Sequence, residues 1–150
     1  MRIAMFEPEI AGNVGAVMRL CACMGARVDL IEPMGFEWDD RRVRRAAMDY
    51  IDHVEVVRHA DFAAFHATLG EGRLVLFTTK ATQSAYDYAY CPDDVLLFGK
   101  ESAGVPDHVA DVSDAKVRLP MRAQVRSLNV ATSAAIALAE ALRQTGTLPR

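Results

Sequence analysis

Short, continuously apolar runs alternate along the chain with longer segments in which apolar residues recur at helical spacing. Runs such as Leu74–Phe77 and Val95–Phe98 lack the in–out alternation of a half-exposed strand, so they predict strands covered on both faces. Strands and helices in alternation predict an α/β domain with a mainly parallel sheet flanked by helices. The predicted strands are Ile3–Phe6, Val28–Ile31, Val54–Val57, Leu74–Phe77, Val95–Phe98 and Lys116–Leu119, and the predicted helices are 13–25, 39–47, 60–69, 107–112 and 128–145.

The length of the chain fits one such domain. A chain of 150 residues that is 51% hydrophobic can bury one core and leaves little room for a second, so residues 1–150 are expected to form a single domain. No apolar run approaches the length of a membrane span and residues 1–10 lack a signal-peptide layout, which predicts a cytoplasmic protein. The cysteines form no CxxC pair and the four histidines show no metal-ligand spacing, so we expect neither a disulfide framework nor a metal site.

Charge is unevenly distributed along the chain. The net charge of −3, from 17 basic and 20 acidic residues, argues against nucleic-acid binding by bulk attraction. Residues 116–150, however, carry six basic side chains and one acidic one, a net charge of +5, which leaves −8 for residues 1–115. Four arginines also fall within positions 41–45, either as a solvated, salt-bridged face or as a contact to a phosphate backbone.

Three predicted strands end in polar or glycine-containing segments. Ligands of parallel α/β sheets bind outside the carboxyl ends of the strands, so these segments form one pocket if the three strands are neighbours. Gly99 and Gly104 allow the backbone to approach a ligand, although an ordinary strand-to-helix turn has the same composition. The segments are Thr78-Thr79-Lys80, Gly99-Lys100-Glu101-Ser102-Ala103-Gly104-Val105-Pro106 and Pro120-Met121. The irregular stretch 80–92, with three tyrosines, is long enough to predict a functional loop.

The first predicted helix carries a stripe of small residues with one arginine, namely Gly12, Gly15, Arg19 and Cys23. Glycine in a helix costs roughly 1 kcal/mol relative to alanine, so Gly15 indicates a close approach by another group. Arg19 is suited to bind a phosphate through two parallel hydrogen bonds. A tight helix–sheet contact with a solvated arginine explains the same stripe equally well.

The last predicted helix has two faces able to pack. Ala131, Ala135 and Ala139 form one stripe of small side chains, and a second contains Leu138 and Leu142. One stripe can be buried in the domain while the other packs against a second copy of the chain. We therefore expect a homodimer. The alternative is that alanine is present only because it favours helix formation.

Two nucleotide-binding motifs are excluded. Gly12-x-x-Gly15 after the first strand lacks the full G-x-G-x-x-G pattern of a dinucleotide-binding enzyme. Gly99-Lys100 is not a P-loop, because Asp94 stands where the first glycine belongs and Glu101 where serine or threonine is required.

Several short motifs occur in a fixed order over nearly the whole chain. They are Glu7-Pro8-Glu9-Ile10 with Asn13, Gly15 and Arg19; residues 30–36 with Trp38 and Asp39; the arginine run to Asp49-Tyr50; Thr78-Thr79-Lys80; Phe98-Gly99-x-Glu101-x-x-Gly104; Pro120-Met121; residues 126–130; and Glu140 with Arg143-Gln144. In this order and spacing they resemble the SPOUT (SpoU–TrmD) class of RNA methyltransferases, and among these the bacterial 2′-O-methyltransferases of the tRNA wobble nucleotide.

The resemblance implies an α/β domain with a C-terminal trefoil knot, a homodimer, and S-adenosylmethionine held by the three strand-end loops without a metal. The implied reaction is methylation of the ribose 2′-OH of cytidine or uridine at the wobble position of the tRNA anticodon. The implied cofactor contacts are Phe77, Thr78, Gly99, Glu101, Leu119, Met121, Ser127 and Leu128. The implied catalytic residues are Arg19, Asn13 and Asn129, and those expected to bind RNA are Arg19, Arg41, Arg42, Arg45 and Arg126.

The chain departs from the family pattern at three positions. Ala16 replaces a second asparagine, Ala131 replaces a serine, and Ala139 replaces a tyrosine near the C-terminus. These departures keep two alternatives open, a non-catalytic module that binds S-adenosylmethionine or RNA and a 2′-O-methyltransferase of another RNA.

Overall fold

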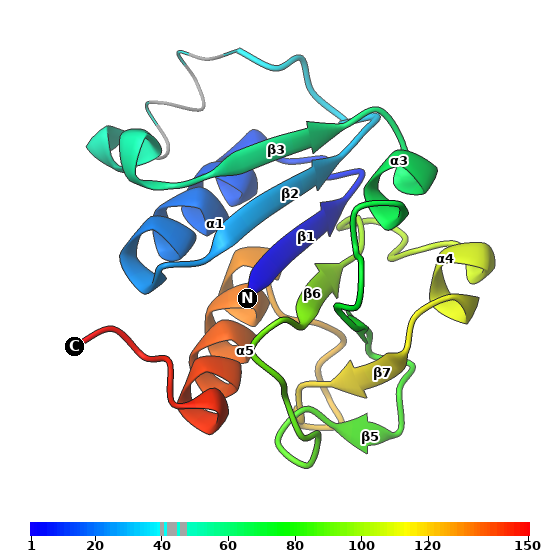
Figure 1. Ribbon diagram of the computed structural model, residues 1–150. Helices are drawn as coiled ribbons and strands as arrows, with labels where there is room; N and C mark the ends of the chain where they lie inside the picture. Colours follow the sequence, from blue (N-terminus) through cyan, green and yellow to red (C-terminus); the bar gives the residue numbers. More distant parts are fainter. Residues whose placement is uncertain (40, 42–44, 46–47) are drawn as a thin grey trace.

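A parallel sheet forms the centre of the molecule (Figure 1). The computed structural model describes residues 1–39, 41, 45 and 48–150, and within these residues seven strands lie in the order β3-β2-β1-β6-β4-β7-β5. Every pair of these strands is parallel, which confirms the prediction of an α/β fold with a mainly parallel sheet. The strands are β1 (Arg2–Phe6), β2 (Arg27–Ile31), β3 (Val56–His59), β4 (Leu74–Phe77), β5 (Gln83–Ser84), β6 (Val95–Phe98) and β7 (Ala115–Arg118).

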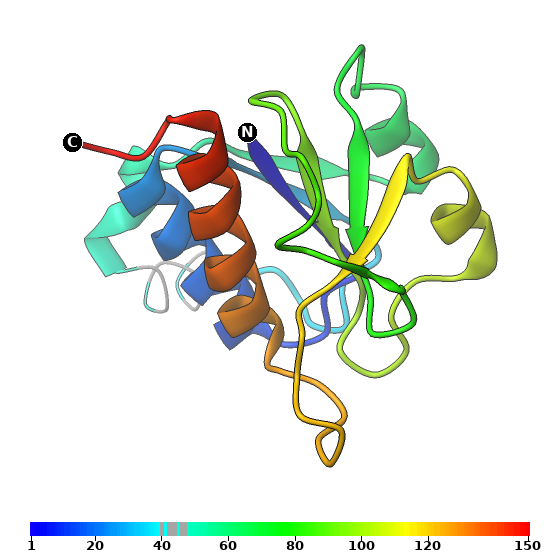
Figure 2. The same cartoon turned by 90° about the horizontal axis from the view of Figure 1, so that it is seen from below.

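Helices cover both faces of this sheet. Figure 2 shows α1 (Ala11–Met24) and α5 (Val130–Thr145) on one side and α3 (Phe62–His66) and α4 (Asp107–Asp111) on the other. Side chains of α1 and α5 join one buried apolar cluster, and Phe65 and Val109 join a second. The continuous apolar runs therefore belong to strands with two buried faces, as expected.

Local sequence signals begin and end these helices. Asn129 caps α5 by accepting hydrogen bonds from the backbone nitrogens of Ala131 and Thr132, at 2.9 and 3.2 Å. Both α1 and α5 end at a glycine with φ near +70°, Gly25 and Gly146, a conformation that favours glycine. Within the described residues no helix is both long and apolar enough to cross a membrane.

The structure corrects several predicted boundaries. β3 begins two residues later than predicted, because a 3-10 helix, η1 (Met48–His53), precedes it with Val54 and Glu55 as the connection. α3 is shorter than the predicted helix 60–69, and the predicted helix 39–47 lies largely outside the described residues. The stretch 80–92 contains β5 and packs into the core, where the Tyr90 hydroxyl donates to the Ala85 carbonyl at 2.9 Å and burial raises the pKa of Tyr90.

The strand order places the site. β6 pairs with β4 and β4 pairs with β7, so the three strand-end segments singled out in the sequence are neighbours. β1 lies on the other side of β6, which brings the segment between β1 and α1 to the same edge of the sheet. Ligands of open α/β sheets bind at such an edge, where the direction of strand succession reverses.

Candidate functional site

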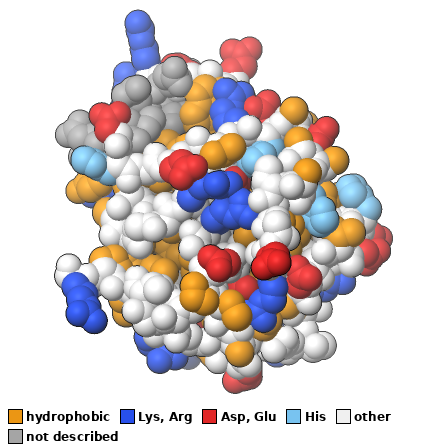
Figure 3. Space-filling view, in the orientation of Figure 1, with side chains coloured by type: hydrophobic (Ala, Val, Ile, Leu, Met, Phe, Trp, Pro, Cys, Tyr) orange, Lys and Arg blue, Asp and Glu red, His pale blue; other side chains and the backbone are white. Residues whose placement is uncertain are grey.

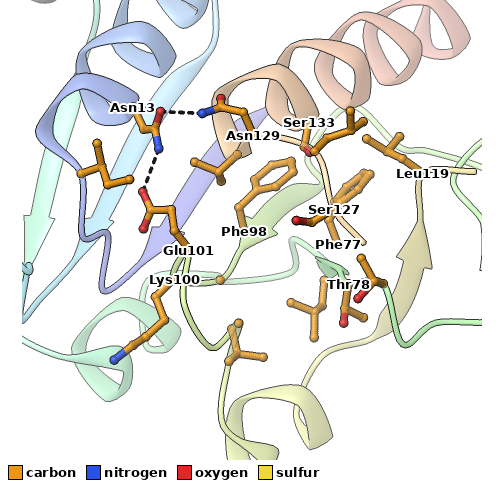
Figure 4. Close-up of a pocket in the computed structure, with 18 of the residues that line it drawn as sticks. Asn13, Phe77, Thr78, Phe98, Lys100, Glu101, Leu119, Ser127, Asn129 and Ser133 are labelled. Atoms are coloured by element: carbon orange, nitrogen blue, oxygen red, sulfur yellow. Dashed lines mark hydrogen bonds between the residues drawn. The ribbon is translucent and has the colours of Figure 1, made fainter. Parts of the chain in front are cut away.

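A pocket of about 420 Å³ opens at the carboxyl ends of β6, β4 and β7 (Figure 4). All eight residues predicted to contact a cofactor line it, and so do Asn13 and Asn129. Other lining residues were not among the predicted site residues or strand-end segments, namely Ile10, Leu76, Phe98, Val130 and Ser133. A signal for Ser133 was present, because it lies one helical turn after Asn129 and therefore on the same side of α5.

A chain of hydrogen bonds crosses the rim of the pocket. The Asn129 amide nitrogen donates to the side-chain oxygen of Asn13 at 2.9 Å, and the Asn13 amide nitrogen donates to Oε1 of Glu101 at 3.0 Å (Figure 4). The backbone nitrogen of Glu9 donates to the other carboxylate oxygen of Glu101 at 2.9 Å. These bonds tie together α5, α1 and the loops after β1 and β6, so the carboxylate of Glu101 organises the site.

The loop after β6 is closed by its own backbone. Lys100 and Gly104 exchange two backbone hydrogen bonds, at 3.0 and 2.8 Å, and Gly104 has a φ of +68°. A Cβ atom on Gly99 would lie 2.4 Å from the carbonyl carbon of Gly104. The two glycines therefore permit this tight turn, and the turn places Glu101 at its tip.

The pocket combines a flat apolar wall with hydroxyl groups. The rings of Phe77 and Phe98, side by side in the sheet, stack with centroids 4.9 Å apart and planes 18° apart. Thr78 and Ser127 contribute hydroxyl groups beside this wall (Figure 4). Such a lining suits a ligand that joins a flat ring to a hydroxylated sugar. Within the described residues no group of three or more His, Cys, Asp or Glu side chains is placed to hold a metal ion.

Arg19 lies outside the lining of this pocket, on an exposed face of α1. Its guanidinium carbon lies 5.0 Å from the centre of the Tyr50 ring in η1, the distance of a cation–π contact. The stripe of small residues on α1 does not form one buried face, because Gly15 is buried while Gly12 and Cys23 are exposed. Within this chain, the structure thus brings Asn13 and Asn129 together but leaves Arg19 apart from them.

The other arginines expected to bind RNA are exposed where the structure describes them. Arg41 and Arg45 are exposed, and Arg42 lies outside the described residues. Arg126 is exposed in segment 119–129, which projects from the domain at the foot of Figure 2. On the face drawn in Figure 3, basic and acidic side chains of the described residues are interspersed.

Comparison with known proteins identifies the class to which this fold and pocket belong. The family model described as the SpoU rRNA Methylase family matches residues 1–139, and the chain belongs to this family. This confirms the resemblance noted in the sequence.

Individual relatives narrow the class. The tRNA (cytidine(34)-2'-O)-methyltransferase of Beijerinckia indica subsp. indica is 51% identical over 150 residues, which cover 99% of this chain and 94% of the relative. A solved structure described by the words "Structural insights into the 2-OH methylation of C/U34 on tRNA" superposes with a TM-score of 0.90 at 37% identity, covering 95% of this chain and 94% of the other. An AdoMet-bound rRNA methyltransferase from Sinorhizobium meliloti superposes with a TM-score of 0.86 at 25% identity, covering 95% of this chain and 55% of the other.

Proposed function

We propose that this chain transfers a methyl group from S-adenosylmethionine to the ribose 2′-OH of the wobble nucleotide, cytidine or uridine, of a tRNA anticodon. The observation that carries the proposal is the 51% identity, over nearly the full length of both chains, to a tRNA (cytidine(34)-2'-O)-methyltransferase. The strand-end pocket supports it independently, because it is built where α/β sheets bind ligands. The reaction takes place in the cytoplasm, as the sequence predicts.

The pocket fits S-adenosylmethionine. Its volume of about 420 Å³ lies in the range of small-molecule sites, and its apolar wall and hydroxyl groups match an adenine ring and a ribose. The residues that would hold the cofactor are Phe77, Thr78, Gly99, Glu101, Leu119, Met121, Ser127 and Leu128. The AdoMet-bound state of the Sinorhizobium meliloti relative supports the same choice of ligand. Once bound, S-adenosylmethionine supplies an electrophilic methyl group on a sulfonium centre.

The task of this chain is then mainly positioning. Transfer requires the 2′-oxygen in line with the methyl group, and held geometry of this kind lowers a barrier without acid or base strength. Asn13 and Asn129, joined to each other and to Glu101, order the rim of the pocket where the ribose would enter.

Arg19 is assigned to the phosphate of the substrate. A guanidinium stays protonated in proteins, so Arg19 binds the phosphate and orients the hydroxyl, and the proton passes to a phosphate oxygen or to water. No metal takes part in the proposed reaction.

A second copy of the chain completes the proposal. On α5, Leu138 and Leu142 face the core, whereas Ala131 and Ala135 are half-buried and Ala139 is exposed, so one stripe stays available to a partner. A homodimer would add the basic side chains of the second chain to the grip on RNA, for which Arg41, Arg42, Arg45 and Arg126 are the candidates. The resemblance to the SPOUT class also supports a C-terminal trefoil knot.

Transfer of radioactive label from S-adenosylmethionine to tRNA that lacks modification tests the proposal. We expect the wild-type chain to label the tRNA, and Arg19→Ala to lose labelling while it still binds S-adenosylmethionine. Binding of the cofactor without any transfer by the wild-type chain would contradict the proposal and support a non-catalytic module, a possibility connected with Ala139. Labelled transfer that Arg19→Ala retains would contradict the role of Arg19 alone.

A further inference from the structure

Glu9 lies where three strand-end loops meet, beside the pocket and not in its lining. Its carboxylate accepts two hydrogen bonds from Ser102, one from the backbone nitrogen at 2.8 Å and one from the hydroxyl at 2.7 Å. Its own backbone nitrogen donates to the carboxylate of Glu101 at 2.9 Å. Glu9 thus makes three hydrogen bonds to two successive residues at the tip of the loop after β6. We call this set of bonds the Glu9 clasp.

The loop after β2 supports Glu9 from the other side. The Gly35 backbone nitrogen donates to the Pro8 carbonyl at 2.9 Å. A Cβ atom on Gly35 would lie 2.9 Å from Cα of Glu9, closer than real Cβ atoms approach, and 3.3 Å from Cγ of Glu9, which is a tight contact. The absence of a side chain at Gly35 therefore makes room for Glu9. The bond from Gly35 to Pro8 also fixes the neighbouring backbone, so that the Glu9 carboxylate can reach Ser102.

The Glu9 clasp is connected to the pocket through Glu101. Glu101 and Asn13 line the pocket. Glu9 and Ser102 are not among its lining residues in the described part of the chain. One oxygen of Glu101 is held by the Glu9 backbone and the other by the Asn13 amide. Asn13 in turn accepts from Asn129. A displacement of the loop tip would accordingly move all three side chains on which the proposed chemistry depends.

We propose that Glu9 is a positioning residue of the methyl-transfer site, which acts by holding Glu101 and, through it, Asn13 and Asn129. This inference rests on the proposed function. Ser102 is exposed and Glu9 is half-buried, and neither belongs to the buried apolar clusters, so the main consequence of the bonds between them is the placement of Glu101. Bonds to an ionised carboxylate are also shorter and roughly twice as strong as those between neutral groups, which suits a positioning role.

The chain offers a matched control that joins the same two loops. Lys100 pairs with Glu7 at 2.7 Å, so this ion pair also links the loops after β1 and β6. It involves neither the carboxylate of Glu101 nor Ser102. Glu7→Gln therefore removes the negative charge of this ion pair between the loops and leaves the Glu9 clasp intact.

The test compares Glu9→Ala, Ser102→Ala and Ser102→Thr with Glu7→Gln. For Glu9→Ala we expect kcat for tRNA methylation to fall roughly tenfold to a hundredfold, the range of a small misplacement of reacting groups, with the KM for tRNA unchanged. The side-chain amide NMR signals of Asn13 should shift, because their hydrogen-bond acceptor moves. Ser102→Thr keeps the hydroxyl and should retain the wild-type kcat. Ser102→Ala loses the hydroxyl but keeps the backbone bond, so its kcat should lie between those of the wild type and Glu9→Ala. Melting temperatures of all variants should stay close to that of the wild type.

Two results would overturn the inference. The first is a loss of kcat in Glu9→Ala that is no larger than the loss in Glu7→Gln. The second is a loss of kcat in Glu9→Ala that comes with a clear fall in melting temperature and with unshifted Asn13 signals. The NMR measurement needs no methyl transfer. If the wild-type chain methylates no tRNA, the proposed function fails, and a shift of the Asn13 signals in Glu9→Ala but not in Glu7→Gln still decides whether Glu9 positions the site.

Discussion

Asn129 donates a hydrogen bond to the side-chain oxygen of Asn13 across 2.9 Å, although the two residues are 116 positions apart. With its own side-chain oxygen, Asn129 also accepts from the backbone nitrogens of Ala131 and Thr132. One side chain thus begins α5 and joins that helix to α1 at the rim of the pocket. The start of the last helix and the geometry of the site consequently depend on the same residue.

Substitutions at Asn129 should separate these two roles. Asn129→Asp keeps an oxygen to cap α5 but loses the donor to Asn13, because an ionised carboxylate only accepts and would face the Asn13 oxygen that now accepts from Asn129. We expect nearly wild-type stability in urea unfolding and a loss of methyl transfer. Asn129→Ala should lose activity and also about 1 kcal/mol of stability, the usual cost of a missing N-cap. Wild-type activity in Asn129→Asp would show that the bond to Asn13 is dispensable.

Gly99→Ala should weaken cofactor binding. The added Cβ would lie 2.4 Å from the backbone of Gly104, so the turn that carries Glu101 must open. We expect the affinity for S-adenosylmethionine, measured by calorimetry, to fall at least roughly tenfold, since a shift of this size disturbs several contacts at once. Gly12→Ala is the control, because its Cβ would meet nothing within 4 Å. Equal affinity in the two variants would contradict this account of the turn.

A buried carboxylate on β2 should matter for stability. Asp29 is fully buried and lies 2.8 Å from a guanidinium nitrogen of Arg27 and 2.7 Å from Nε2 of His59. Removal of Asp29 leaves the Arg27 guanidinium without this counter-charge and Nε2 of His59 without its partner, and breaking a buried ion pair costs about 3–5 kcal/mol. Asp29→Ala should lose that amount in urea unfolding, whereas Asp87→Ala, at an exposed position, should change stability by less than about 0.5 kcal/mol. A loss below about 1 kcal/mol for Asp29→Ala would show that the cluster is not needed for folding.

The three cysteines should differ in reactivity. Burial raises the pKa of the Cys21 thiol to about 12, while Cys23 and Cys91 are exposed. Because the thiolate is the reactive form, Ellman's reagent at mildly alkaline pH should modify two thiols in the native protein and the third only after unfolding. Rapid modification of all three in the folded protein would contradict the burial of Cys21.

Ser102 should keep Glu9 ionised at low pH. Hydrogen bonds from the hydroxyl and backbone of Ser102 lower the pKa of Glu9 below its usual value. A carboxylate with a lowered pKa adds stability above its unfolded pKa and loses it as the pH falls through the folded value. In an NMR titration, Ser102→Ala should raise the pKa of Glu9 toward the ordinary range, and an unchanged titration would rule out the bond to the hydroxyl.

The strands could be predicted well because each is a continuous apolar run that must be buried on both faces. Their order could not, since adjacency depends on how the connecting segments cross the sheet, and this decided whether three strand ends form one pocket. The Glu9 clasp was also beyond prediction, because Glu9 and Ser102 are 93 positions apart and neither residue type is unusual in a loop. The knowledge that Asn13, Glu101 and Asn129 belong to one site came from the family resemblance, and the bonds that join them came from the structure.

The length of the stretch 80–92 and its tyrosines predicted a functional loop, but the structure shows a packing role for these side chains. Tyr88 packs beside Arg73, whose guanidinium makes two hydrogen bonds of 2.8 Å to Asp94. The aromatic residues here anchor a long connection to the body of the domain. None of the residues 80–92 lines the pocket, whereas Thr78 and Thr79, just before this stretch, do.

The proposed enzyme methylates one hydroxyl group at one nucleotide. It is tested most directly with an anticodon stem-loop RNA, S-adenosylmethionine and the wild-type chain, followed by mass spectrometry of the digested nucleosides. The account predicts one 2′-O-methylated nucleoside per RNA, located at the wobble position, and none when that nucleotide carries a 2′-deoxyribose. A methyl group on the base, at another position, or on the RNA with the 2′-deoxy nucleotide would contradict it.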